Sequence, residues 1–229
     1  MNTKFLSALT ATAAATALFG AAAPSQAASF GTGGISFAQN TDILFTFGET
    51  HGSYQSSLAI FEVNNSILSI PRTLFSETKA SDNGAANEYR GTLGNTVLGS
   101  GKVTFTFLAN KIYTLGVVTG GQKAVSTSAL NGGGIQRAVF GDTSLRNALN
   151  LETTNTFQAA GQYTNGLASL FNGGTVISFD DGGNRNDRDF QDFTVTAQAV
   201  PEPMTMTGLA LGLGGLVAAR RRRGSNTAS

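Results

Sequence analysis

Four Asn-Gly pairs divide the middle of this chain into short segments and constrain its fold more than any other feature. Asparagine and glycine both tolerate positive φ, so each pair favours a tight turn. Runs of β-branched and aromatic residues lie between the pairs, which stand at Asn83-Gly84, Asn131-Gly132, Asn165-Gly166 and Asn172-Gly173. This pattern is typical of an all-β sandwich or barrel. We predict an antiparallel β-sandwich, jelly-roll-like, with one short helix.

Apolar residues at strand periodicity indicate where the strands lie. The predicted strands cover residues 35–47, 54–63, 67–75, 102–107, 112–118, 175–179 and 193–197. The second is apolar on both faces, which indicates a central strand, whereas Pro71 confines the third to an edge. The fourth and fifth follow one another closely, so we expect them to form a hairpin.

Residues 124–151 are the least β-like part of the domain. Within them, residues 142–149 are expected to form the short helix, because Asp142 or Thr143 can cap its N-terminus. Leu145 and Leu149 stand four positions apart and would share the inner face of this helix.

The N-terminus has the composition of a secretory signal peptide. Lys4 is followed by an apolar, alanine-rich run at residues 5–23 and by the small-residue site Ser25-Gln26-Ala27. We predict a signal helix within residues 1–27 and cleavage after Ala27. Residues 28–199 then form one domain, which no disulfide can support because the chain has no cysteine.

The net charge of +1 comes from the ends of the chain rather than from the domain. Without Lys4, Glu202 and the arginines at 220–223, the domain keeps 10 basic and 13 acidic residues, a balance of −3. A weakly acidic domain argues against nucleic acid as a partner.

The C-terminus combines three elements in order. The tripeptide Pro201-Glu202-Pro203 precedes an uncharged apolar run at residues 204–219, and the run is followed by Arg220, Arg221, Arg222 and Arg223. A spanning helix needs about 20 residues, and Val200 and the arginine stems can extend this shorter run. We predict a transmembrane helix with the arginines on the cytoplasmic side, then a disordered tail at 225–229. A buried core helix is the alternative, but it fits the arginine cluster poorly.

Residues 200–224 resemble the PEP-CTERM sorting signal of Gram-negative bacteria and cyanobacteria, which has the same three elements in the same order. In that family an exosortase, a membrane-embedded peptidase, recognises the signal. The resemblance implies cleavage near the Pro-Glu-Pro tripeptide. The two prolines hold Glu202 in extended backbone, the form that a protease cleft binds. The expected partners are therefore an exosortase and, transiently, the inner membrane.

An acidic stretch near the end of the domain is the strongest candidate for a site. Its five carboxylates are those of Asp180, Asp181, Asp187, Asp189 and Asp192, set among asparagines and glycines. Calcium takes about six to eight oxygen ligands in flexible geometry, which such a loop can offer. We predict these aspartates as ligands of Ca²⁺, although their spacing is not that of an EF-hand. The alternative is a solvated turn in which Arg185 and Arg188 neutralise the aspartates.

This stretch is similar to the F-[DE]-D-x-x-G-G-x-x-D-x-[FY]-x-D signature of a β-rich domain of bacterial surface proteins. The matching residues are Phe179, Asp180, Asp181, Asp187, Asp189, Phe190 and Asp192, whereas the glycines here come earlier, directly after Asp181. Residues 54–63 also resemble a Tyr-x-x-Ser-Leu-x-x-(Phe/Tyr)-x-Val strand of that domain. The activity of the domain is not established, so the resemblance implies a fold rather than a function.

Motifs for catalysis are sparse. His51 is the only histidine and stands in an expected loop, where a solvated side chain is the better interpretation. Two carboxylates for glycoside hydrolysis could be chosen from the acidic stretch, but no tryptophan is present to stack on sugars. The chain also has no G-x-S-x-G motif or phosphate-binding loop. We therefore expect no enzyme.

Taken together, these features predict an exported protein of the cell envelope, outer surface or extracellular matrix. Its role would be structural or adhesive, with Ca²⁺ stiffening the fold or bridging to anionic exopolysaccharide. The alternative is a secreted hydrolase or binding module that acts on exopolysaccharide.

Overall fold

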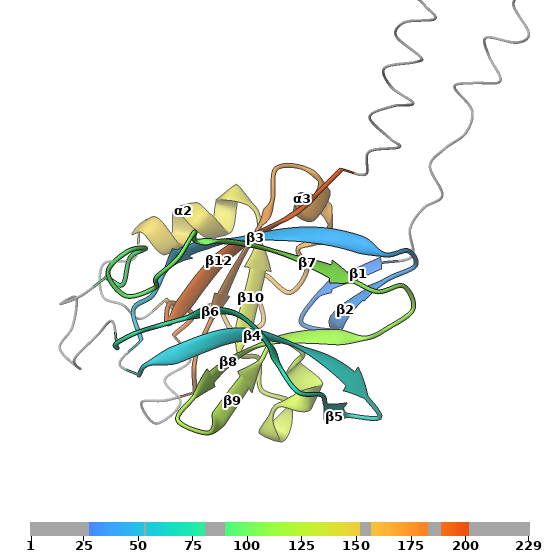
Figure 1. Cartoon of the computed structure of the whole chain (residues 1–229), viewed down its shortest axis with the longest axis horizontal. Helices are drawn as coiled ribbons and strands as arrows, with labels where there is room; N and C mark the ends of the chain where they lie inside the picture. The colour runs from blue at the N-terminus through green and yellow to red at the C-terminus, as the bar shows by residue number, and fades with distance from the viewer. Residues whose placement is uncertain (1–27, 53, 81–89, 152–156, 183–188, 202–229) are drawn as a thin grey trace, which may run out of the picture.

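The computed structural model describes residues 28–52, 54–80, 90–151, 157–182 and 189–201. They form two antiparallel sheets with few helices (Figure 1), which confirms the all-β prediction. The predicted signal peptide and the apolar run at 204–219 lie outside these residues. Within them, no helix has the length and apolar character needed to cross a membrane.

The first sheet has seven strands, in the order β1-β2-β8-β4-β5, with β6 also paired to β4 and β9 to β8. Its strands are β1 (Ala28–Gly31), β2 (Gly34–Phe37), β4 (Ser56–Asn64), β5 (Ile67–Leu68), β6 (Arg72–Ser76), β8 (Tyr113–Thr119) and β9 (Gln122–Val125). Strand β4 is central, as its apolar faces predict. The run around Pro71 lies at the edge of this sheet, as expected, but it splits into two strands, β5 and β6, which both pair with β4.

The second sheet has five strands, in the order β10-β11-β12-β3-β7. Its strands are β3 (Thr41–Glu49), β7 (Lys102–Phe107), β10 (Ala138–Gly141), β11 (Thr175–Phe179) and β12 (Phe193–Ala199). The helices are α2 (Thr143–Leu151), α3 (Leu167–Phe171) and two single turns of 3₁₀-helix, η1 (Ser128–Leu130) and η2 (Gly132–Gly134). Of these, only α2 is predicted from the sequence.

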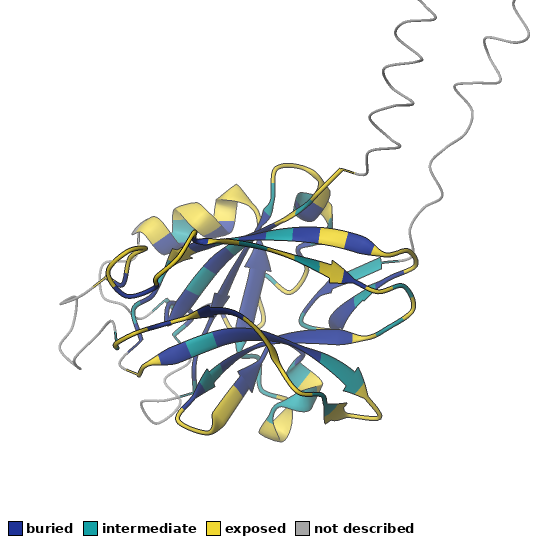
Figure 2. Cartoon of the chain, in the orientation of Figure 1, coloured by how far each residue is buried: buried dark blue, intermediate teal, exposed yellow. Residues whose placement is uncertain are grey.

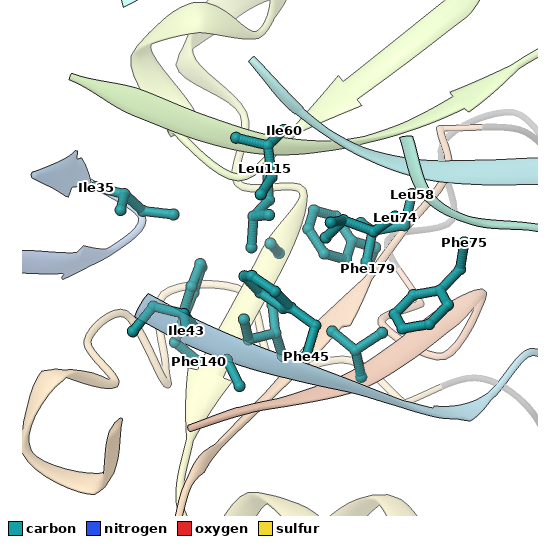
Figure 3. Close-up of a cluster of buried hydrophobic side chains, with 14 of the residues drawn as sticks. Ile35, Ile43, Phe45, Leu58, Ile60, Leu74, Phe75, Leu115, Phe140 and Phe179 are labelled. Atoms are coloured by element: carbon teal, nitrogen blue, oxygen red, sulfur yellow. The ribbon is translucent and has the colours of Figure 1, made fainter. Parts of the chain in front are cut away.

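The two sheets share one hydrophobic core in which phenylalanine supplies many of the largest buried side chains. Figure 3 shows Ile43 and Phe45 of β3 on one side of this core and Leu58 and Ile60 of β4 on the other. Buried aromatic side chains dominate the energetics of such cores. Because the chain has no cysteine, this core stabilises the domain without any disulfide.

Helix α2 covers the outer face of the second sheet and closes a smaller core. Asp142 caps it, because the Ser144 N–H donates to Asp142 Oδ1 at 2.8 Å. Leu145 and Leu149 are both buried against this sheet, as predicted. Figure 2 shows that the opposite side of α2 is exposed.

The predicted hairpin between residues 102–107 and 112–118 is wrong. Strand β7 pairs with β3 in the second sheet, whereas β8 pairs with β2 and β4 in the first. The β7–β8 loop, residues 108–112, therefore crosses from one sheet to the other. Phe107 and Tyr113, which flank this loop, are both buried, with ring centroids 5.1 Å apart. Alternation predicts which face of a strand is buried, but it does not specify the partner strand.

Strands β3 and β12 lie side by side and define two ends of the molecule. Their register runs from Thr194 opposite Glu49 to Ala199 opposite Ile43. At about 3.3 Å per residue, the ends of this pair are about 20 Å apart. We call the side near Glu49 the Glu49 end, and the side near Ile43 and Ala199 the terminal end.

Candidate functional site

Three segments of the chain meet at the Glu49 end. Strands β11 and β12 are antiparallel neighbours, with Phe179 opposite Phe193. Residues that follow β11 and residues that precede β12 must therefore lie together, and the Asp192 N–H donates to the Phe179 carbonyl at 2.9 Å. The third segment is the chain that follows β3. We call Asp180, Asp181, Asp189 and Asp192, which lie on the first two segments, the acidic cluster.

A β-bulge brings the chain after β3 against this cluster. The register between β12 and β3 shifts at Thr194 and Val195, across from Gly48. A Cβ on Gly48 would lie 2.9 Å from the Thr194 carbonyl oxygen, so this approach requires glycine. Beyond the bulge, the His51 N–H donates to the Asp192 carbonyl at 3.4 Å. A Cβ on Gly52 would lie 3.3 Å from Asp181 Oδ2, so this backbone packs directly on the carboxylates.

The segment that leads into β12 is held by its own side chains. Phe190 is buried in the smaller core beneath α2. Its N–H donates to the Phe157 carbonyl at 2.8 Å, and the buried Gln191 returns the contact by accepting the Phe157 N–H at 2.8 Å. These anchors place Asp189 and Asp192 on either side of a fixed pair of residues.

Hydrogen bonds and one ion pair fix the buried carboxylates. Asp180 Oδ2 accepts from Arg137 Nη1 at 2.7 Å, and Asp180 Oδ1 accepts from the Gly182 N–H at 2.7 Å. Asp192 Oδ2 accepts from the Asp181 N–H, also at 2.7 Å. Asp180, Asp181 and Asp192 are buried. The site thus concentrates negative charge where water screens it poorly.

The electrostatic consequence appears at Asp192. Burial raises the pKa of its carboxyl well above the ordinary value, and the nearby charges of Asp181, Asp189 and Asp180 raise it further. The hydrogen bond from the Asp181 N–H opposes this shift without cancelling it. The folded protein therefore favours either a proton or a positive ion at this position.

The donor set fits a hard cation. Asp180, Asp189 and Asp192 each offer one carboxylate oxygen, and these three oxygens lie within 4.8 Å of one another. Calcium binds oxygen donors of this kind, with carboxylates prominent among them. Each carboxylate oxygen has two lone pairs, so the bonds from Arg137 and the backbone do not exhaust them.

The predicted ligands are thus only partly brought together. Asp180, Asp189 and Asp192 form the close group, and Asp181 lies beside it without contributing to the three converging oxygens. Asp187 lies outside the described residues, as do Arg185 and Arg188 of the solvated-turn alternative. Burial of Asp180 and Asp192 shows that the described part of the stretch is not a solvated turn.

Arg137 is the residue of the candidate site that sequence reasoning missed. It stands 43 positions before Asp180, immediately before β10. Ala138 is opposite Phe179 in the β10–β11 pair, so the preceding residue falls next to Asp180. Only the strand pairing carries this information, because no local pattern marks Arg137.

The interpretation of His51 as a solvated side chain is wrong. Its side chain is only 16% exposed, and its Nε2 lies 3.7 Å from Glu49 Oε1. Arg90 pairs with the other oxygen of the Glu49 carboxylate. The bulge at Gly48 explains the difference, because it turns the chain after β3 onto the protein instead of into solvent.

No family model matches this chain, and neither a curated protein nor a solved structure is significantly similar to it.

Proposed function

We propose that this chain is an exported, non-enzymatic β-sandwich, jelly-roll-like, with a structural or adhesive role in the cell envelope or extracellular matrix. The leader at 1–27 directs export, and the tail at 200–224 delivers the protein to an exosortase at the inner membrane. Ca²⁺ at the acidic cluster stiffens the mature domain or bridges it to anionic exopolysaccharide.

The observation that carries the calcium part of this proposal is the convergence of the Asp180, Asp189 and Asp192 oxygens, with Asp180 and Asp192 buried and Asp189 half-buried. Arg137 supplies one positive charge to this cluster, through Asp180. A bound calcium ion supplies the further positive charge that lets the remaining carboxylates ionise. The carboxylates are held in place by the β11–β12 pairing, the Gly48 bulge and the buried Phe190.

Thermal unfolding tests the calcium part of this proposal. We expect calcium to raise the midpoint of the domain, EDTA to lower it, and magnesium to have a smaller effect because it demands tighter octahedral geometry. Asp189→Asn should abolish the calcium response. Asp42→Asn is the matched control, because Asp42 is an exposed carboxylate at the terminal end that accepts from Thr106 Oγ1 at 2.5 Å. If neither calcium nor EDTA changes the unfolding midpoint, calcium binding is contradicted.

A hydrolase is the second candidate, and one observation favours it. Asp192 has a raised pKa beside other carboxylates, which is how glycosidases separate an acid from a nucleophile. The burial of Asp192 argues against this role, because a glycosidase acid must itself contact the sugar, whereas a glycan can reach a bound ion past the half-buried Asp189. A panel of polysaccharides assayed on the mature domain decides. Turnover that Asp192→Asn abolishes would replace the structural proposal.

Processing is tested separately by the intact mass of the protein recovered from its native cells. We expect the mass of a chain that begins after Ala27 and ends near Pro201-Glu202-Pro203. Full-length chain that is freely soluble in the cytosol contradicts both sorting signals.

A further inference from the structure

The described domain begins and finishes at its terminal end. Ala28 of β1 lies opposite Phe37 of β2, and the Phe37 carbonyl accepts the N–H of Asn110 in the β7–β8 loop. At the other terminus, the Val200 N–H donates to the Asp42 carbonyl at 2.9 Å. Strand β3, which contains Asp42, pairs with β7, and the end of β7 leads into the same β7–β8 loop. Chain entry and chain exit therefore flank one loop.

Exposed aliphatic side chains lie in this loop, in the segment from β5 to β6 and at the chain exit. We call them the aliphatic rim: Ile67, Ile70, Leu108, Ile112 and Val200. Two backbone contacts hold the first sheet's share of the rim together. Ile67 of β5 lies opposite Asn64 at the end of β4, and the adjacent Val63 N–H donates to the Ile112 carbonyl at 2.8 Å. Exposed apolar side chains mark an interaction surface where they lie together, and these two contacts bring Ile67 and Ile112 close to each other.

The charges at the rim do not prevent contact with an apolar phase. Lys111, between Leu108 and Ile112, pairs with Glu62, its Nζ lying 2.9 Å from each carboxylate oxygen. The acidic cluster, by contrast, lies at the Glu49 end, about 20 Å away along β3 and β12. Asp42, whose carbonyl accepts the Val200 N–H, adds an exposed carboxylate to the terminal end, where it accepts from Thr106 Oγ1. The charges near the rim are therefore separate and hydrogen-bonded, unlike the converging carboxylates of the acidic cluster.

The lengths of the flanking chain identify the occupant. Met204, which begins the uncharged run at 204–219, is three residues from Pro201, a span of at most about 11 Å. Ala23, the last residue of the apolar run at 5–23, is five residues from Ala28, at most about 18 Å. If either apolar run is embedded in a bilayer, the short connecting segment therefore holds the terminal end of the domain close to the bilayer surface.

We propose that the aliphatic rim is a membrane-docking surface, whose side chains enter the lipid interface while either apolar run is embedded. This inference rests on the proposed function, in which these runs are a leader and a transmembrane helix. Burial of the rim in the lipid interface is favourable because it removes apolar surface from water. The docked domain holds the acidic cluster away from the bilayer, where extracellular calcium and anionic glycan can reach it.

The absence of cysteine makes a direct test possible, because any introduced cysteine is the only one. The full chain is reconstituted in phosphatidylethanolamine–phosphatidylglycerol vesicles after labelling with a polarity-sensitive fluorophore at Ile67→Cys or Ile112→Cys. Leu98→Cys is the matched control. Leu98 is 62% exposed, between Ile112 at 55% and Ile67 at 71%, but it adjoins Val97, which pairs with Glu77. The Glu77 N–H donates to the carbonyl of Ser56 at the start of β4, the end of that strand away from the rim.

We expect the labels at Ile67 and Ile112 to shift to shorter wavelength and to be quenched by nitroxide on the lipid headgroups, whereas the label at Leu98 stays in water. A chain that floats with the vesicles while all three labels stay in water overturns docking and leaves the proposed tail helix standing. The rim would then suit a protein partner. Equal quenching at all three positions overturns docking too. A chain that does not float with the vesicles contradicts the tail helix and docking together.

Discussion

The Asp192 carboxylate accepts the backbone N–H of Asp181 at 2.7 Å, which places two aspartates side by side at the ends of two paired strands. The strand pairing makes this proximity unavoidable, because Phe179 and Phe193 are opposite each other in β11 and β12. The repulsion between these buried carboxylates must therefore be reduced by a nearby positive charge or by protonation. Arg137, a proton or a bound cation can each do this.

We predict that, without calcium, Asp192 makes stability fall as pH rises. The folded state raises the pKa of Asp192, so above the ordinary aspartate value the folded protein binds more protons than the unfolded chain. The corresponding stabilisation is present in full at low pH and is lost as pH rises through the raised pKa. Denaturant unfolding in EDTA, from about pH 4 upward, measures this slope.

Asp192→Asn provides the comparison for that pH series. The variant lacks the titrating group, so its stability should be less dependent on pH over the same range. The lowered pKa values of Glu62 and Asp142 are common to both proteins and cancel in the difference. Identical slopes in parent and variant would show that Asp192 does not hold a proton in the folded state.

We predict that Arg137→Met destabilises the domain by about 3–5 kcal/mol, because it leaves the buried Asp180 carboxylate without its cation. Calcium should recover part of the loss. Lys111→Met is the control, since it breaks the Lys111–Glu62 pair at the surface and should change stability much less. Both effects are measured by denaturant unfolding. Equal effects would mean that the Arg137–Asp180 pair contributes no more to stability than the surface pair does.

We predict that Gly48→Ala destabilises the domain by about 1–3 kcal/mol and weakens calcium binding, because its Cβ would collide with the Thr194 carbonyl and distort the bulge. Gly33→Ala is the matched control. A Cβ on Gly33 meets nothing within 4 Å, so that variant should stay within about 0.5 kcal/mol of the parent. A parent-like Gly48→Ala protein would show that the bulge does not position the site.

Much of the fold is predictable because local alternation reports burial directly. The bounds of β7 and β11, the central place of β4, and the capping of α2 by Asp142 all follow from nearby residues. Strands β1, β9 and β10 are only four residues each, too short for a periodic signal to stand out.

The candidate site is less predictable because its parts come together through pairing. The aspartates form a dense acidic stretch in the sequence, and this stretch lies between two predicted strands. The Arg137–Asp180 contact depends on β10 lying beside β11, and the position of His51 depends on a bulge 3 residues earlier in the chain. Local sequence specifies neither of these, because both arise from contacts between segments that are distant along the chain.

Calorimetric titration of the mature domain with calcium is the most direct test of the metal site. We predict saturable binding by the parent protein, loss of binding in Asp189→Asn, and parent-like binding in Asp42→Asn, whose substituted carboxylate lies at the opposite end of β3. No heat of binding in the parent, or the same affinity in Asp189→Asn, would contradict a calcium site in the acidic cluster.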